Sequence, residues 1–117
     1  HLDFALPRMA MVIEKLVVYP ENMARNLALL GGLHNSQRVM LALTQAGVTR
    51  EDAYRLVQRN AMAVWQSPPP RPATALIDRL QADKDVTSKL DAKTLQSCFD
   101  DVHHVARVDE IFARVFG

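Results

Sequence analysis

Cysteine is nearly absent from this sequence, since Cys98 is the only one among 117 residues. A single thiol excludes an internal disulfide and a CxxC metal site, and it agrees with a reducing, intracellular setting. We therefore expect a cytoplasmic protein. Because Cys98 lies in the apolar context of Leu95 and Phe99, we interpret it as a small buried hydrophobic residue rather than as a nucleophile.

An excess of charge of one sign is also missing, because 14 Lys and Arg residues accompany 13 Asp and Glu residues. The formal net charge of +1 gives no long-range field that would gather nucleic acid or an anionic membrane, so we expect neither partner. No stretch reaches the ~20 consecutive apolar residues that a membrane span requires. The first 18 residues are interrupted by charges and do not read as a signal peptide.

Catalytic and cofactor motifs are missing as well. The sequence has no GxGxxG, P-loop, GxSxG or paired-carboxylate motif and offers no support for catalysis by the chain itself. His103 and His104 precede Asp109 and Glu110, but adjacent histidines point apart on a helix and no HExxH spacing exists. We expect no metal site and no cofactor.

The residues that are present predict one all-α domain. A hydrophobic fraction of 49% is enough for a single core in a chain of this length. Apolar residues recur at three- and four-residue steps through residues 2–18, and Pro7 should lie near the start of this helix or kink it. Pro20 should open a second helix that stops at Gly31 and Gly32.

Two helices with clear start signals should lie at the centre. Asn35 or Ser36 can cap a helix that runs to Gly47 and is apolar on most sides, which is typical of a core helix. Residues 49–52, Thr-Arg-Glu-Asp, resemble a capping box and should open the next helix. Its predicted buried face consists of Ala53, Leu56, Val57, Ala61 and Val64.

The second half of the chain should contain shorter elements. Prolines in residues 67–72 exclude a continuous helix and favour an extended surface loop, with a polyproline ligand as the alternative. Short helices should follow, capped near Thr74, Asp85 and Asp91. A last helix from about His104 to Val115 should turn its apolar face inward, namely Val105, Val108, Ile111, Phe112 and Val115.

Charged and titratable residues leave two interpretations open. Four arginines on three predicted helices could converge on a phosphate or carboxylate: Arg25, Arg38, Arg55 and Arg59. Structural ion pairs with Glu21, Glu51 and Asp52 explain them at least as well. His34, which follows the glycine pair, could lie at the mouth of a pocket or be solvated.

Five segments match a known family in the same order along the chain: residues 16–27, 31–33, 36–39, 49–62 and 108–112. The first is similar to the VVYPENM-x-RNL segment of bacterial adenylosuccinate lyases, and the likeness covers essentially the whole chain. Related lyases and carboxymuconate cycloisomerases share an NL-x-x-x-GGL stretch. The SQRV and EDAYRLVQRNAM segments favour the adenylosuccinate branch.

This resemblance implies a specific enzyme context. Family members are homotetramers that eliminate fumarate from adenylosuccinate and from the succinylated carboxamide ribonucleotide, in purine and AMP biosynthesis, by general acid and base catalysis. Their acid and base, a histidine and a serine on an SSxMPxKxN loop, lie upstream, and no such loop occurs here. The resemblance therefore implies an active parent enzyme, an inactive 117-residue piece and no catalytic residue in this chain.

The resemblance also divides the chain. Residues 1–18 are expected to be the end of a long central bundle helix, and residues 19–117 a compact, multi-helix C-terminal domain. This domain would pack against the rest of the same polypeptide and other subunits, with Ser36 and Arg38 closest to the entrance for the purine nucleotide substrate. The sequence starts at His1, inside the expected helix, so we expect a piece of a longer chain.

Two other function classes remain as alternatives. One is a free-standing helical module whose apolar grooves bind a partner helix. The other is a small phosphate-binding enzyme built on the arginines. An upstream SSxMPxKxN segment in the parent reading frame would favour the lyase domain over the module, and the phosphate-binding enzyme would require that a nucleotide raise the melting temperature of the chain.

Overall fold

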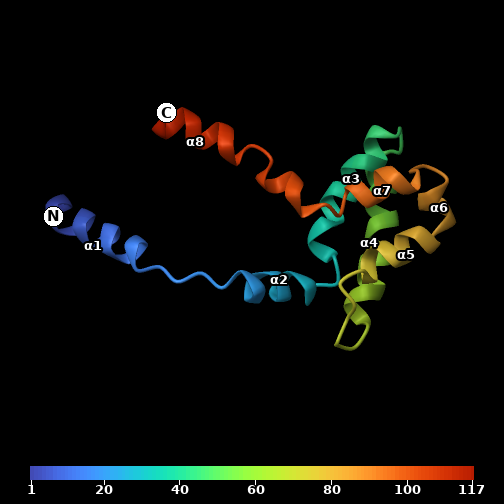
Figure 1. The fold of residues 1–117 in the computed structure, drawn as a ribbon. Coiled ribbons are helices and arrows are strands. Elements are labelled where there is room, and N and C mark those ends of the chain that lie inside the picture. Colours follow the sequence, from blue (N-terminus) through green and yellow to red (C-terminus); the bar gives the residue numbers. More distant parts are fainter.

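Helices make up all the regular structure of the chain. The computed structural model describes residues 1–117 and contains eight α-helices, two 3₁₀ helices and no strand (Figure 1). In chain order these are α1 (Leu2–Glu14), α2 (Pro20–Ala28), η1 (Leu33–Asn35), α3 (Ser36–Gln45), α4 (Arg50–Gln66), α5 (Ala75–Ala82), α6 (Lys84–Thr87), α7 (Ala92–Ser97), η2 (Asp101–Val105) and α8 (Val108–Phe116). The all-α prediction is confirmed. None of the helices has the length and apolar character needed to cross a membrane.

Helices α3 and α4 form the centre of a compact unit that α5, α6 and α7 complete (Figure 1). Twelve buried hydrophobic residues make its core: Val39, Leu43, Ala53, Val57, Val64, Leu76, Ile77, Leu80, Val86, Leu90, Leu95 and Cys98. Cys98 is therefore buried as predicted, and burial raises the pKa of its thiol. All twelve lie between residues 39 and 98, so both ends of the chain stay outside this core.

The start of α4 follows the predicted capping pattern. The Thr49 Oγ1 accepts a hydrogen bond from the backbone N–H of Asp52 at 3.2 Å and donates to the Asp52 carboxylate at 2.9 Å. Ahead of it, Gly47 ends α3 with a φ of 89°, a left-handed conformation that costs glycine little. Helix α4 therefore begins where the sequence predicts.

The buried faces of α3 and α4 differ in part from prediction. On α4, Ala53, Val57 and Val64 are buried, whereas Leu56 and Ala61 are only half-buried and Asn60 takes a buried place. On α3 the prediction of a central core helix is confirmed, since Val39 and Leu43 are fully buried, although Leu41 on the outer side is 49% exposed. Helices α4 and α7 pack against α3, and they leave its outer side to solvent.

The shorter elements are close to their predicted positions. Thr74 and Asp91 precede α5 and α7, but α6 is capped by the Asp83 carboxylate, which accepts from the Asp85 backbone N–H at 3.1 Å. The cap predicted near Asp85 is therefore supplied by Asp83, two residues earlier. The proline loop is exposed, and Arg71 ties it to the end of α4 by donating to the Trp65 and Ser67 carbonyls at 2.8 and 3.0 Å.

The two ends of the chain form helical arms without any buried residue (Figure 1). Helix α1 runs through Pro7 and ends at Glu14, four residues before the predicted Val18. Helix α2 begins at Pro20 as predicted. The prediction that the last helix turns its apolar face into the core is wrong, because every residue from 101 to 117 is exposed and no element covers that face.

We predict that Thr49→Ala lowers the free energy of unfolding by about 1 kcal/mol, because it removes the acceptor for a helix N–H group. Urea denaturation followed by circular dichroism measures the change. Thr44→Ala is the matched control: Thr44 lies inside α3 and donates to the Met40 and Leu41 carbonyls, so its loss should stay within about 0.5 kcal/mol. Equal effects from the two substitutions would contradict the role assigned to the cap.

Candidate functional site

The glycine turn before α3 brings the predicted site residues against the compact unit. Gly31 and Gly32 have φ values of 59° and 82°. A Cβ atom on Gly32 would lie 3.1 Å from Phe99 Cε1 and 3.3 Å from the Ala73 carbonyl oxygen, so the turn needs glycine for space as well as for conformation. The Gly31 carbonyl accepts from the Leu76 backbone N–H at 2.9 Å, which fixes the turn to α5.

Arg38 links α3 to the end of α7. Its Nη1 donates to the Asp100 carbonyl oxygen and its Nη2 donates to the Ser97 carbonyl oxygen, each at 2.8 Å. The last carbonyls of a helix have no partner within it, and a fork of guanidinium donors suits them. Arg38 therefore fixes the chain as it leaves α7.

Ser36 is held differently and faces another part of the surface. Its Oγ donates to the Leu33 carbonyl oxygen at 2.6 Å, across η1. It also lines a groove of about 290 Å³ between α3 and α4, together with Met40 and Tyr54. Side chains two residues apart on a helix point in different directions, so the structure does not bring Ser36 and Arg38 into one site.

His34 lies beside a cavity of about 330 Å³ bounded by α2, η1, α5 and α7. Its Nε2 is 3.1 Å from Asn35 Nδ2 and 3.3 Å from the Asp101 carboxylate. One ring nitrogen cannot accept and donate at the same time, so the tautomer decides which neighbour His34 bonds. Asn35 is 2% exposed, and its Oδ1 has no hydrogen-bond partner.

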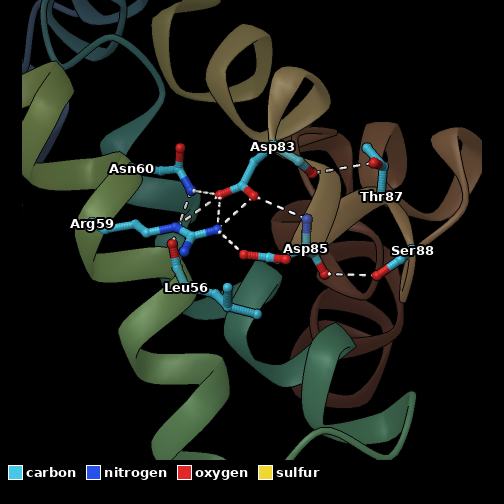
Figure 2. Close-up of polar contacts among 7 residues, drawn as sticks. All are labelled: Leu56, Arg59, Asn60, Asp83, Asp85, Thr87 and Ser88. Carbon is cyan, nitrogen blue, oxygen red and sulfur yellow. Dashed lines mark hydrogen bonds and ion pairs between the residues drawn. The ribbon is translucent and has the colours of Figure 1, made fainter.

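A second polar cluster joins α4 to the turn between α5 and α6 (Figure 2). Arg59 donates from Nε to Asp83 at 3.0 Å, and its Nη2 lies 2.6 Å from Asp83 Oδ1 and 2.7 Å from Asp85 Oδ2. Asn60 Nδ2 donates to the same Asp83 carboxylate at 2.7 Å and to the Leu56 carbonyl at 2.9 Å. The Asp83 side chain is only 12% exposed, so this carboxylate is largely shielded from water and accepts from several donors.

The hydrogen bonds decide the ionisation of this cluster. Burial raises the pKa of Asp83, but donation from Arg59, Asn60 and the Asp85 backbone N–H outweighs burial and leaves the pKa below its usual value. The Asp83 and Asp85 carboxylates raise the pKa of Arg59. Both partners therefore stay charged at neutral pH.

The arginines do not converge on a common anion site. Arg38 binds carbonyls, Arg55 pairs with Asp52 within α4, and Arg59 pairs with Asp83 and Asp85. Structural ion pairing is thus the better of the two predictions, although the sequence indicated the partner only for Arg55. The Arg59 partners lie 24 and 26 residues away, and the one signal for them was a polar Asn60 on an apolar helix face.

Comparison with known proteins bears out the resemblance noted in the sequence. Residues 32–115 match the family model described as adenylosuccinate lyase C-terminus. The chain belongs to this family. It is 42% identical over 120 residues to the adenylosuccinate lyase of Helicobacter pylori strain J99, covering 98% of this chain and 27% of the relative. It is 40% identical over 114 residues to that of Bacillus subtilis strain 168, covering 97% of this chain and 25% of the relative.

The chain spans about a quarter of the length of these curated adenylosuccinate lyases. The matched region begins at Gly32 and contains both the Arg38 contacts and the Arg59 cluster. Both sets of contacts join helices to one another. Within this adenylosuccinate lyase domain their evident role is to fix the arrangement of the helices.

We predict that Asp83→Asn lowers the free energy of unfolding at pH 7 by about 2 kcal/mol, because it weakens charged hydrogen bonds from Arg59 and Asn60. The folded-state pKa of Asp83 is lowered, so this stabilisation is fully present above the unfolded pKa of about 3.9 and is lost as pH falls through the folded value. Urea melts from pH 7 to pH 2.5 should therefore show the variant and the unmodified chain converging in acid.

Asp85→Asn is the matched control, since Asp85 contacts the same arginine but its side chain is 68% exposed. Its effect should remain below about 1 kcal/mol at pH 7. A loss for Asp83→Asn that persists unchanged at low pH would contradict the electrostatic explanation.

Proposed function

We propose that this chain is the C-terminal domain of an adenylosuccinate lyase, an enzyme of purine and AMP biosynthesis. The parent would eliminate fumarate from adenylosuccinate and from the succinylated carboxamide ribonucleotide. The observation that carries this proposal is the family match over residues 32–115, together with relatives of that name at 40–42% identity. The chain itself would contribute no catalytic residue, and the acid and base would come from the rest of the parent.

We propose that residues 1–18 are the end of a long central helix and that residues 19–117 are the C-terminal domain. The break after Glu14 and the new helix start at Pro20 support a division at this point. The exposed apolar side chains of α1 support packing against further helices, including those of other subunits in a cytoplasmic homotetramer.

We propose that Ser36 and Arg38 influence the substrate entrance by positioning rather than by contact. Both Arg38 Nη atoms are engaged by carbonyl oxygens, and the Ser36 hydroxyl donates to Leu33. Arg38 would hold the connection after α7 in place, and any entrance built on that connection would shift with it.

One observation favours a free-standing interaction module as the second candidate. The α3–α4 groove is almost wholly apolar on its surface, and Tyr54 beside it is 54% exposed. A partner helix could lie there. A free-standing module would act without a parent enzyme. A chimera with a relative distinguishes such a module from the lyase domain.

The test is a chimera in which residues 1–117 replace the matching segment of Bacillus subtilis adenylosuccinate lyase. We predict that the chimera releases fumarate from adenylosuccinate and that the isolated chain shows no activity above background. Absorbance assays at increasing protein concentration measure both. Turnover by the isolated chain that scales with its concentration would refute the inactive assignment.

The matched control replaces the same segment with the corresponding residues of the Helicobacter pylori relative and tests whether the recipient tolerates such an exchange. Activity of that control together with a folded but inactive chimera of this chain would contradict the proposed function.

A further inference from the structure

The segment between α7 and α8 has few polar contacts with the compact unit. Every residue of η2 is exposed. Arg38 binds the Ser97 and Asp100 carbonyls just before η2 begins. From Asp101 onward, the 3.3 Å contact with His34 is the only hydrogen bond to a residue before Asp100. Beyond the point that Arg38 holds, one histidine therefore provides the polar link between η2 and the compact unit.

The Nε2 atom of His34 lies between two groups that require opposite protonation states of it. Asn35 Nδ2, at 3.1 Å, can only donate, so it requires an Nε2 atom without a proton. The Asp101 carboxylate, at 3.3 Å, can only accept, so it requires an Nε2 atom that carries a proton. His34 therefore bonds one of these neighbours at a time.

Burial decides which neighbour the neutral form of His34 bonds. Asn35 is 2% exposed, whereas the Asp101 side chain is 57% exposed. A buried amide N–H group without an acceptor costs more free energy than an exposed carboxylate, which water can bind. Neutral His34 therefore carries its proton on Nδ1, and its Nε2 accepts from Asn35.

Protonation of His34 reverses this preference. Both nitrogens of an imidazolium carry a proton, so Nε2 can no longer accept from Asn35 and donates to the Asp101 carboxylate instead. The Asn35 amide can adjust to this change, because its Oδ1 has no hydrogen-bond partner. A half-turn of the amide breaks only the bond to His34 and presents the amide oxygen to the Nε2–H group.

The charges around His34 leave Asp101 as its ionic partner. The residues that line the cavity with His34 come from α2, α5, α7 and the start of η2, and Asp101 is the only charged residue among them. Arg38 is charged as well, but its donors are taken up by two backbone carbonyls. The rings of His103 and His104, in η2 itself, contact each other.

We infer that His34 and Asn35 form a proton-dependent switch that holds η2 in acid and releases it at higher pH. Imidazoles ordinarily change charge between about pH 5 and 8, whereas aspartate carboxylates ordinarily stay ionised over that range. At the acid end, protonated His34 binds Asp101 and fixes η2 to the glycine turn. At the alkaline end, neutral His34 bonds Asn35 and leaves Asp101 to water. The switch consists of contacts within this chain and is independent of the proposed function.

Nuclear magnetic resonance of the unmodified 117-residue chain tests the switch directly. Proton–nitrogen correlation spectra of the imidazole at about pH 8 should show that Nε2 is the nitrogen without a proton. A proton on Nε2 under these conditions would overturn the inference.

Hydrogen exchange measures how firmly η2 is held. The Val102 and His103 amides hydrogen-bond Asp100 at the start of η2. After correction for the intrinsic effect of pH, they should exchange about two- to fivefold more slowly in acid than at the alkaline end, the range expected for a partly exposed ion pair. Equal corrected rates at the two ends would also overturn the inference.

Two variants identify the groups responsible. His34→Gln and Asp101→Asn each remove the ion pair and should abolish the pH difference in exchange of the Val102 amide. His103→Gln is the matched control, because it removes an imidazole from η2 and should leave the difference intact. A difference that persists in His34→Gln, or that disappears only in His103→Gln, would overturn the inference. The protonation of Nε2 is measured on the unmodified chain, so the test does not depend on the stability of a variant.

Discussion

The packing of α3 against α4 is the contact on which the rest of the compact unit depends. Val39 and Leu43 of α3 meet Ala53, Val57 and Val64 of α4 in one buried core, and α5 and α7 close that core from the other sides. Burying each large aliphatic side chain contributes roughly 1.5–3 kcal/mol. No single polar contact in the chain contributes as much to the free energy of folding as this apolar cluster does in total. The polar networks therefore refine the arrangement of a unit that apolar burial already stabilises.

The Asp83 cluster shows what polar contacts add to such a core. Asn60 lies on the otherwise apolar buried face of α4. Burying its amide without a hydrogen-bond partner would lower the stability of the fold. The Asp83 carboxylate accepts from Asn60 and also from Arg59, so a single acceptor satisfies a buried amide and a guanidinium. These bonds require the α5–α6 turn to lie at one position along α4. Hydrophobic packing alone is less directional. The cluster therefore specifies where the α5–α6 turn lies along α4.

The sequence predicted local features well and non-local features less well. The Thr49 cap, the helix start at Pro20 and the end of α3 before Gly47 depend on neighbouring residues only, and they are where the pattern placed them. Helix α2 ends at Ala28, three residues before the predicted stop at Gly31. The partners of Arg38 and Arg59 come from segments 24 to 62 residues away. Charge and spacing offer many possible partners at that distance, and only the fold selects among them.

The error at α8 has a different physical origin. The predicted apolar face of this helix is confirmed, because Val108, Ile111 and Phe112 lie along one side of α8. Periodicity identifies which face avoids water but contains no information about the surface that covers it. In a complete domain the covering surface belongs to the same chain, and an inward-facing prediction follows. The covering surface was assumed here to lie within residues 1–117, and none of these residues covers the apolar face of α8.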